Sequence, residues 1–356
     1  MTPRRDGTDA PLRVLQVGCG SISRSWLEPL QGMADATVVG FVDIDAAAAR
    51  EAARRYGDSA PAGTDLQAML PLTRPDVVFD CTVPEAHHDV TLAALEAGCH
   101  VFGEKPMAES MPQAQAMVGA AARYGRTYAV MQNRRFDPSI RALRAFLDEG
   151  PIGRVTTVHA DFFIAPHFGG FREAMRHVLL RDMAIHTFDA ARFLTREEPE
   201  AVTCTSWNPP GSWYAHGASA VATFEMTGGV AFTYRGSWCA EGLATPWEGH
   251  WRIVGTRGSI VWDGAEDLRC EVVSKPGGLL YEHERVPVPR LARSDSRLWH
   301  AKAVEAFVQS VRAGTMPETV CSDNVRSLAM VFAACDSADA QRRVAMRDGT
   351  SLTLDE

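Results

Sequence analysis

Apolar runs of strand length alternate with helical patterns along the first 130 or so residues. Residues 14–17, 37–42 and 77–81 are short runs dominated by Val, Leu and Phe, which is typical of strands buried on both faces. The patterns at 24–33 and 46–56 predict helices between them. The alternation continues with strands at 100–102 and 127–131 and helices at 65–70, 89–97 and 108–124. It predicts an α/β domain built on a doubly wound parallel sheet with right-handed crossovers.

The hydrophobic period changes after about Asn133. Asp137-Pro138 opens a helical pattern that closes at Gly150-Pro151, and the later strands are longer and alternate between apolar and polar residues. Turn sequences at 227–229 and 255–258 each join two of these strands. Candidate strands lie at 155–163, 201–207, 218–226, 230–238, 248–255 and 259–262, and candidate helices at 139–149, 182–194, 296–313 and 323–342. This half predicts a mainly antiparallel sheet with inserted helices.

Length and pattern together divide the chain into three segments. The chain has 356 residues, which is enough for two domains with a substantial core. Residues 1–11 carry Arg4 and Arg5 with no apolar segment behind them, so we expect a flexible tail and not a signal peptide. We expect one domain over residues 12–134 and another over 135–356, with the catalytic cleft between them.

Composition narrows the classes of partner and compartment. The formal net charge of −8 argues against a nucleic-acid partner, because binding phosphates needs a concentrated positive field. The eight cysteines are scattered and form no C-x-x-C pair, so neither a zinc framework nor a secreted disulfide scaffold is expected, and a cytoplasmic protein with reduced thiols is the simplest interpretation. No run approaches ~18 apolar residues, so we expect no membrane span.

A glycine-rich turn follows the first apolar run. Gly18 permits a tight turn, and Gly20 lets the backbone come close to a bulky anion. Together with Ser21 and Ile22, these residues lead to a helix start whose free N–H groups can hold a pyrophosphate. Ser23 occupies the third position of the G-x-G-x-x-G pattern, so the match is incomplete, and a simple strand-to-helix turn is the alternative interpretation.

An acidic residue stands where a dinucleotide-binding domain needs one. Asp43 ends the second apolar run, close to the ~20-residue spacing expected for the carboxylate that binds the adenosine ribose. A carboxylate accepts hydrogen bonds from a 2′-hydroxyl and repels a 2′-phosphate, and Ile44 follows where a phosphate-binding Arg could stand. We therefore favour NAD over NADP. The alternative is that Asp43 and Asp45 only cap the next helix.

Two further groups of residues have the chemistry of a catalytic site. Lys105, in Glu104-Lys105-Pro106, follows a predicted parallel strand and could donate a hydrogen bond to a substrate oxygen, with the X-Pro bond, cis or trans, fixing its approach. A surface turn is the alternative. Asp182 and His186 are i and i+4 on a predicted helix, and Asp189 is i+3 from His186. A carboxylate beside an imidazole sets its tautomer and suits it to acid–base work.

Other interpretations remain for the second group. A metal site would need more ligands than one Asp and one His, and a surface pair needs no function at all. The segment 82–88 is expected to be a loop at the carboxyl end of a strand, where ligands bind in open α/β sheets, and His87 or His88 could lie near the cofactor.

These motifs together resemble those of the Gfo/Idh/MocA family, the glucose–fructose oxidoreductase and inositol dehydrogenase group. The likeness covers nearly the whole chain: the turn at 18–23, Asp43, Thr82-x-Pro84-x-x-His87, the segment 94–98 leading to Glu104-Lys105-Pro106, and Asp182-x-x-x-His186-x-x-Asp189. The resemblance implies a Rossmann domain followed by an α+β domain with a large, mainly antiparallel open sheet. It also implies a homodimer or homotetramer built through that sheet, with 135–356 as the substrate-binding and oligomerisation domain.

The resemblance also implies site residues. The catalytic lysine of the family falls on Lys105, and the Asp and His of its inositol dehydrogenases fall on Asp182 and His186. The expected cofactor contacts are Gly18, Gly20, Ser21, Ile22, Asp43, Thr82, Pro84, His87, Glu104 and Lys105, and the expected substrate contacts are Lys105, Asn133, Arg176, Asp182 and His186. No metal ligand is expected.

The sequence departs from the family pattern in the predicted substrate region. His177-Val178 stands where many members have two glycines, and Ala184 stands where many have one. Arg172, Arg176, His177 and Arg181 also make this segment basic. A substrate with a carboxylate or phosphate is one interpretation. The alternative is that these residues stabilise a loop or face a neighbouring subunit.

The function that these residues favour is NAD(H)-dependent oxidation of a secondary hydroxyl in a sugar, inositol or related polyol. His186 would take the hydroxyl proton, Lys105 would polarise the oxygen, and Asp182 would orient His186 or bind a neighbouring hydroxyl. Two other classes stay open. One is a sugar lyase or glycosidase that uses tightly bound NAD transiently, and the other is a noncatalytic dinucleotide-binding regulator.

Overall fold

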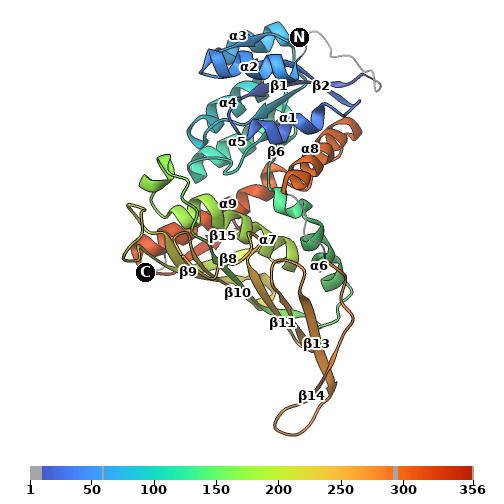
Figure 1. The fold of residues 1–356 in the computed structure, drawn as a ribbon, viewed down its shortest axis with the longest axis vertical. Helices are drawn as coiled ribbons and strands as arrows, with labels where there is room; N and C mark the ends of the chain where they lie inside the picture. The colour runs from blue at the N-terminus through green and yellow to red at the C-terminus, as the bar shows by residue number, and fades with distance from the viewer. Residues whose placement is uncertain (1–9, 58–59, 292–295, 355–356) are drawn as a thin grey trace. The chain divides into compact units, whose positions relative to one another are not determined.

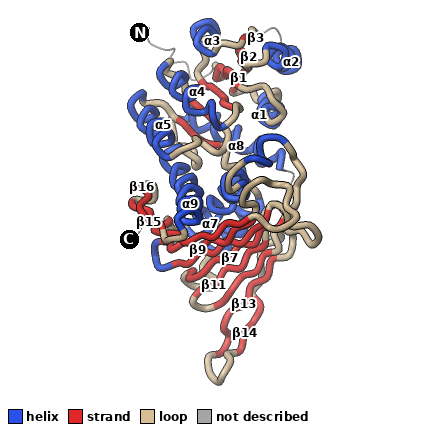
Figure 2. Tube along the Cα trace, turned by 90° about the vertical axis from the view of Figure 1, so that its left-hand side faces the viewer, coloured by secondary structure: helices blue, strands red, loops and turns tan. Residues whose placement is uncertain are grey.

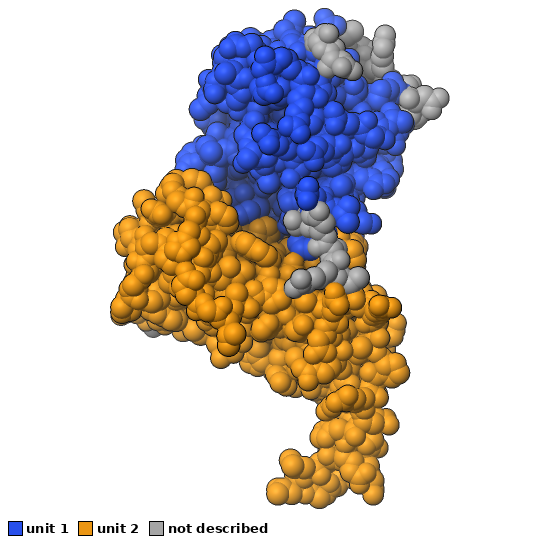
Figure 3. All heavy atoms as spheres, in the orientation of Figure 1, with its two compact units in different colours: residues 1–133, 295–325 blue, residues 134–294, 326–356 orange. Residues whose placement is uncertain are grey.

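The chain folds into two compact units. The structure, a computed structural model, describes residues 10–57, 60–291 and 296–354, so most of the predicted N-terminal tail lies outside the described residues. One unit contains residues 1–133 and 295–325, and the other contains 134–294 and 326–356 (Figure 3). An uninterrupted second domain over 135–356 therefore differs from the structure, because a segment near the C-terminus belongs to the first unit.

The first unit is built on a parallel sheet. In its described residues the sheet has six strands in the order β3-β2-β1-β4-β5-β6, which confirms the doubly wound fold (Figure 2). β1 pairs with β2 on one side and with β4 on the other, so the strand order reverses at β1. Open α/β sheets bind ligands beyond the carboxyl ends of the strands at such a point. The strands are β1 (Leu12–Val17), β2 (Ala36–Val42), β3 (Ala62–Gly63), β4 (Val77–Asp80), β5 (His100–Gly103) and β6 (Tyr128–Val130).

Three helices of the first unit, α2, α3 and α5, begin at polar residues that satisfy free backbone donors. The side chains of Asp45, Asp65 and Ser110 each accept a hydrogen bond from a backbone N–H in the first turn of the helix that follows. The helices are α1 (Ser23–Leu30), α2 (Ala46–Tyr56), α3 (Leu66–Thr73), α4 (Pro84–Glu96), α5 (Met111–Tyr124) and α8 (Ser296–Ala313). The predicted loop over 82–88 is wrong, because α4 begins at Pro84, a residue that suits the first helical position.

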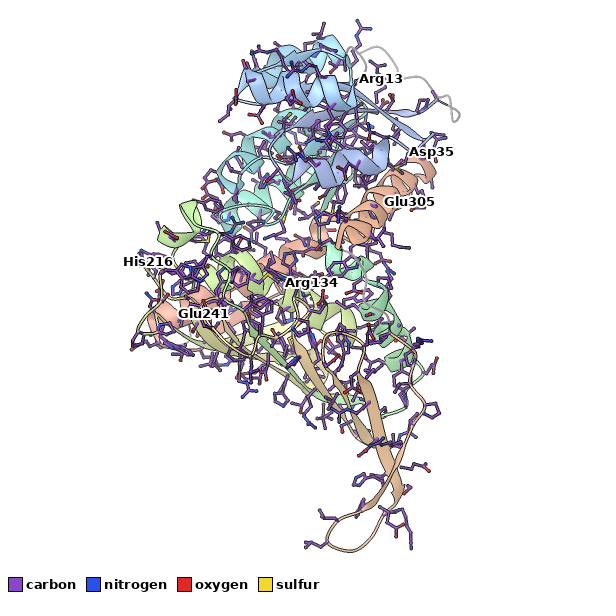
Figure 4. The ribbon with its side chains drawn as sticks, in the orientation of Figure 1. Arg13, Asp35, Arg134, His216, Glu241 and Glu305 are labelled. Carbon is purple, nitrogen blue, oxygen red and sulfur yellow. The ribbon has the colours of Figure 1, made fainter. Side chains whose placement is uncertain are left out.

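Helix α8 is the segment that the sequence assigns to the other domain. Its bounds agree with the predicted helix over 296–313. Phe307 of α8 stacks on Phe102 of β5, with ring centroids 4.6 Å apart and planes inclined by 6°. Arg312 places its Nε 3.2 Å from Oδ1 of Asp35, which is labelled in Figure 4. These long-range contacts place α8 in the first unit, and local periodicity carries no information about them.

The second unit is built on a mainly antiparallel open sheet, as predicted. Its described residues form ten strands in the order β14-β13-β12-β11-β7-β10-β9-β8-β15-β16, and in this sheet only β7 and β10 pair in parallel. The hairpin of β13 and β14 extends away from the other strands (Figure 1). The strands are β7 (Val155–Phe163), β8 (Pro199–Trp207), β9 (Ser219–Met226), β10 (Val230–Ser237), β11 (His250–Gly255), β12 (Gly258–Trp262), β13 (Leu268–Lys275), β14 (Glu282–Arg285), β15 (Val344–Arg347) and β16 (Ser351–Leu354).

Helices cover one face of this sheet. Phe188 packs edge-to-face against Phe224 of β9 and Tyr234 of β10, and Ser337 Oγ accepts a hydrogen bond of 2.9 Å from the Cys204 N–H of β8. The helices are α6 (Pro138–Asp148), a π-helical segment (Leu179–Ala184), α7 (Ile185–Thr195) and α9 (Cys321–Ala340), and short 3₁₀ turns occur at Asn133–Phe136, Gly170–Ala174 and Thr227–Gly229. The π-helical segment stands where the sequence predicts the start of a regular helix.

Three features are absent from the described residues, namely a membrane-spanning helix, a metal-binding cluster and a disulfide. No helix there is both long and apolar enough to cross a membrane. No group of three or more His, Cys, Asp or Glu side chains in that part of the chain is placed to hold a metal ion. The cysteines, which all lie in the described ranges, form no disulfide.

Candidate active site

The glycine turn after β1 lies against the end of β4. Gly18 has φ of +82°, and a Cβ atom added there would lie 2.5 Å from the carbonyl carbon of Cys81. A side chain at this position would therefore be strained and would collide with backbone. Around Gly20 no atom lies within 4 Å of an added Cβ, so the backbone there is open to an approaching group. The turn has the form that a pyrophosphate needs.

Ser23 replaces the third glycine of the pattern and fills its place by bonding. Its side chain is buried, and its Oγ donates a hydrogen bond of 2.7 Å to the carbonyl of Gly20. This bond ties the first residue of α1 back to the turn. Ser21 and Ile22 link the two, and Ile22 is exposed. The incomplete glycine motif therefore still makes a tight turn that leads directly into a helix N-terminus.

Asp43 is held at the carboxyl end of β2. Its Oδ2 accepts a hydrogen bond of 2.7 Å from the Cys19 N–H, and its Oδ1 accepts one of 2.8 Å from the Asp45 N–H. Asp45, and not Asp43, is the residue that caps α2. Each carboxylate oxygen keeps a second lone pair for a hydroxyl donor. Ile44 is almost fully exposed beside it, so a wide apolar side chain adjoins the ribose-binding candidate.

The residues after β4 form a buried hydrogen-bonded group. His87 lies in the first turns of α4, is 1% exposed, and places Nδ1 3.0 Å from Oδ2 of Asp80. Thr82 donates from Oγ1 to Oδ1 of Asp80 at 2.5 Å, and the same Oγ1 lies 3.2 Å from His87 Nδ1. Burial lowers the pKa of His87, but the carboxylates of Asp80, Glu104 and Glu85 together outweigh burial and raise this pKa overall. His87 thus lies inside the domain, and Thr82 is partly exposed above it.

Lys105 follows β5 directly, at the edge of the sheet that carries the glycine turn. Its neighbour Glu104 is buried and accepts hydrogen bonds from the Trp26 indole N–H at 2.9 Å and from the Lys105 backbone N–H at 3.0 Å. The bond between Lys105 and Pro106 is cis. Asn133, after β6 in the same unit, is buried and places Nδ2 3.4 Å from both ring nitrogens of His300. The backbone of the lysine is therefore held beside the buried Glu104 at this edge of the sheet.

Asp182 and His186 lie on consecutive helical segments of the second unit. Asp182 belongs to the π-helical segment, and its Oδ2 accepts a hydrogen bond of 2.7 Å from Nε of Arg172. His186 lies in the first turn of α7 and is 8% exposed. Such wide helical turns recur at functional sites. The sequence names both residues, but it does not reveal the pairing of Asp182 with an arginine ten positions earlier.

Asp189 has a different set of partners from those that the sequence suggests. Its carboxylate accepts hydrogen bonds from Nε and Nη2 of Arg135, at 2.8 and 2.7 Å, and from Ser327 Oγ at 2.7 Å. Ser327 in turn accepts a hydrogen bond from Arg192. The network ties α7 to the chain before α6 and to α9. Sequence reasoning missed Arg135, because nothing local marks it as the partner of an aspartate 54 positions later.

The basic run before Asp182 is largely neutralised within the second unit. Asp339 of α9 accepts a hydrogen bond of 2.8 Å from Arg176, and its Oδ1 lies 3.0 Å from Nε2 of His177. His177 has φ of +50°, a left-handed backbone conformation that glycine adopts most readily. Arg181 lies over the ring of Phe332. Asp339 pairs with two members of this run, and no local sequence pattern marks it as their partner.

Two family models match the chain. A model described as an oxidoreductase family with an NAD-binding Rossmann fold matches residues 12–132. The model of the GFO/IDH/MocA C-terminal domain matches residues 140–261. The two matches fall on opposite sides of the boundary at residue 133 between the units.

Known proteins are similar over long stretches of the chain. Inositol 2-dehydrogenase of Rhizobium meliloti (strain 1021) is 26% identical over 336 residues, which span 93% of this chain and 98% of that protein. D-glucoside 3-dehydrogenase of Escherichia coli (strain K12) is 35% identical over 193 residues, which span 52% of this chain and 55% of that protein. An oxidoreductase from Agrobacterium radiobacter, crystallised with NAD+, L-tartaric acid and magnesium, has the same fold, with a TM-score of 0.82, 20% identity, and coverage of 94% of this chain and 98% of that one.

Proposed function

Because models of one family match both of its halves, the chain belongs to the Gfo/Idh/MocA family of oxidoreductases, and we propose that it oxidises a secondary hydroxyl group of a sugar, inositol or related polyol with NAD. The observation that carries the proposal is the position of Lys105. It follows β5 at the carboxyl edge of the sheet whose glycine turn and Asp43 form a dinucleotide cradle. Open α/β sheets bind their ligands at this edge.

The described residues of the first unit fit NAD. The open backbone at Gly20 and the N-terminus of α1 would hold the pyrophosphate, with Ser21 and Ile22 beside it. Asp43 would accept the ribose hydroxyls. The remaining proposed cofactor contacts follow β4 and β5, namely Thr82, Pro84, Glu104 and Lys105, whereas His87 would act through Thr82 from its buried place.

The proposed chemistry divides among three side chains. NAD, when bound, accepts the hydride of the carbon that is oxidised. Lys105 donates a hydrogen bond to the reacting oxygen, and His186 takes the hydroxyl proton. Asp182 binds a neighbouring hydroxyl, a role that its bond to Arg172 favours over the orientation of His186. Asn133 completes the proposed substrate contacts.

The proposed substrate is uncharged. The names of the two dehydrogenases above, which act on inositol and on a D-glucoside, support a polyol. Two arginines of the basic run that could have bound a carboxylate or phosphate have carboxylate partners within the second unit, since Asp339 pairs with Arg176 and Asp182 pairs with Arg172. These carboxylates reduce the net positive charge of the run. Arg176 stays a proposed substrate contact that would reach a hydroxyl from its exposed pair with Asp339.

Assembly and compartment are also proposals. One face of the antiparallel sheet carries Trp207 and Val221 with 45% and 37% of their surfaces exposed, and these exposed apolar side chains support a homodimer or homotetramer built through the sheet. The reduced state of the cysteines supports a cytoplasmic location.

A substrate panel tests the proposed activity. Inositols, aldoses, glucosides and sugar acids are each mixed with the purified protein and NAD, and formation of NADH is followed by absorbance. We expect sustained turnover with at least one neutral cyclic polyol and slower turnover with the matching sugar acids. Bound cofactor that stays oxidised with every compound, without net NADH, would contradict the proposal and favour a lyase or a regulator.

The preference for NAD over NADP is expected to depend on Asp43. Its carboxylate is fixed by two backbone N–H groups, so a 2′-phosphate would meet a charge that cannot move away. We expect kcat/KM to be higher with NAD than with NADP, and Asp43→Ala to narrow the ratio. Both ratios are measured with one polyol at subsaturating cofactor. A tenfold preference of the unchanged protein for NADP, ~1.4 kcal/mol, would show that the ribose assignment is wrong.

A further inference from the structure

We propose that Arg172 and Asp182 together form a subsite for two neighbouring hydroxyl groups of a cyclic substrate, and that Arg172 thereby determines specificity. The inference rests on the proposed function and extends it to one residue of this chain. The pair lies entirely within the second unit. Arg172 belongs to the 3₁₀ turn Gly170–Ala174, and Asp182 to the π-helical segment.

The ion pair presents a matched acceptor and donor. Nε of Arg172 donates to Oδ2 of Asp182 at 2.7 Å, and the two side chains are 31% and 11% exposed, so the pair is only partly covered. A guanidinium has five N–H donors and a carboxylate has about four acceptor positions, so one bond between them leaves capacity on both. One hydroxyl of a vicinal diol can donate to the carboxylate while the other accepts from the guanidinium.

Two phenylalanines fix the guanidinium and supply apolar surface. Cζ of Arg172 lies 5.1 Å from the ring centroid of Phe168 and 4.7 Å from that of Phe171, which is cation–π distance. These rings remain 55% and 57% exposed. Sugars and cyclitols have apolar C–H faces between their hydroxyls. These faces can pack on the exposed rings while the hydroxyls bind the polar pair.

The segment that carries Arg172 is anchored on both sides. Phe168 packs against the buried Trp238, with ring centroids 6.0 Å apart. The Glu173 carbonyl accepts a hydrogen bond of 2.7 Å from the Ala215 N–H, and the Pro166 carbonyl accepts one of 3.2 Å from Tyr214 Oη. An anchored subsite loses little conformational entropy on binding, so its contacts with the substrate contribute to the affinity without a large entropic cost.

Charge separates this subsite from one for anions. The carboxylate of Asp182 balances the positive charge of Arg172, and a second carboxylate or phosphate would approach both charges together. Two like charges close together near a protein surface repel each other, and this repulsion offsets the attraction to the guanidinium. Neutral diols meet no such penalty, so the geometry favours them over sugar acids.

Binding and turnover of hydroxyl-deleted probes test the subsite. The probes are D-glucose and its 2-, 3- and 4-deoxy analogues, and myo-inositol and its monodeoxy analogues. Their affinity for the NADH-loaded protein is measured by calorimetry, and kcat/KM is measured with NAD. One adjacent pair of hydroxyls should matter most. We expect the affinity and kcat/KM of the unchanged protein to be at least tenfold lower for an analogue that lacks either hydroxyl of that pair. Arg172→Ala should weaken binding of the parent compound at least tenfold. The affinities of this variant for the parent compound and for those analogues should differ by less than twofold.

Matched variants separate the subsite from general damage. Arg172→Lys keeps the charge but loses the planar fork, so it should recover less than half of the lost discrimination. Arg196 also pairs with a carboxylate of the second unit, that of Asp148, at an exposed site, and Arg196→Ala should leave binding and discrimination unchanged. NADH affinity should be the same in every variant, because the dinucleotide cradle lies in the first unit.

Each result decides the inference. Full discrimination in Arg172→Ala, equal loss for every probe including the deoxy analogues, or tighter binding of gluconate than of glucose to the unchanged protein would overturn it. Failure of the unchanged protein to bind any probe would overturn it as well. Binding with discrimination but without NADH formation would leave the subsite standing and refute the proposed dehydrogenase activity instead.

Discussion

Alanine in place of Lys105 or of His186 is expected to lower kcat by at least about a hundredfold. A positioned acid or base typically raises the rate of the chemical step by ~10²–10⁴-fold. The two groups are proposed to act on the same hydroxyl, with Lys105 donating a hydrogen bond to the oxygen and His186 taking the proton. The measurement is hydride transfer in a single turnover with the polyol that the panel identifies, because product release then cannot hide the chemical step.

The affinity for NAD should change little in either variant. The contacts proposed to dominate cofactor binding are made by the glycine turn and Asp43, which are held by backbone bonds that neither substitution touches. Lys275→Ala and His283→Ala serve as matched controls, since both residues are exposed on the hairpin of β13 and β14. Each control should transfer hydride at the rate of the unchanged protein.

The double variant distinguishes a coupled pair from two independent contacts. Groups that act as a unit are impaired less than multiplicatively when both are removed. We therefore expect Lys105→Ala combined with His186→Ala to be little slower than the slower single variant. Near-normal transfer by His186→Ala across about pH 6 to 9 would show that His186 is structural and that the proton leaves by another route.

Local sequence signals predicted most of the first unit. The strand-to-helix turns there are specified within a few residues, as at Gly18, where φ of +82° and the nearby Cys81 backbone admit only glycine. Caps at Asp45 and Asp65 likewise bond to residues two positions ahead. The start of α4 is an exception, because the sequence predicts a loop at Pro84 although proline is compatible with a first helical turn.

Features that depend on distant contacts were not predictable in this way. The bounds of α8 follow from its sequence, but its unit follows from the packing of Phe307 on Phe102, two residues about 200 positions apart along a chain of 356. β14 has four exposed polar residues and no alternation that would mark it as a strand. The candidate site shows the same division, since the sequence selects Asp182 and His186 as chemical groups. The partners of Asp182 and Asp189, which are Arg172 and Arg135, become evident only in three dimensions.

Asp189→Ala is expected to destabilise the fold by about 3–5 kcal/mol. The carboxylate is 1% exposed and the Arg135 side chain 8%, and removing one member of a buried ion pair leaves a desolvated charge behind. At about 2–4 °C per kcal/mol for a domain of this size, the melting temperature should fall by roughly 6–20 °C. Thermal and urea unfolding of the full chain check this, with Asp267→Ala as the matched control. Asp267 pairs with Arg269 at an exposed site, so its loss should cost about 0–1 kcal/mol.

The compensated variant shows whether charge or packing is responsible. Replacing both partners with apolar residues of similar volume, as in Arg135→Met with Asp189→Leu, removes the uncompensated charge and is often neutral for buried pairs. We therefore expect the double variant to regain most of the stability that Asp189→Ala loses. His186 lies three residues before Asp189 on α7, so the rate of hydride transfer by the double variant also shows whether the network positions His186. If it is stable but transfers hydride slowly, the network serves to place His186. If the free energy of unfolding of Asp189→Ala lies within about 1 kcal/mol of that of the unchanged protein, the buried pair does not hold α7 in place.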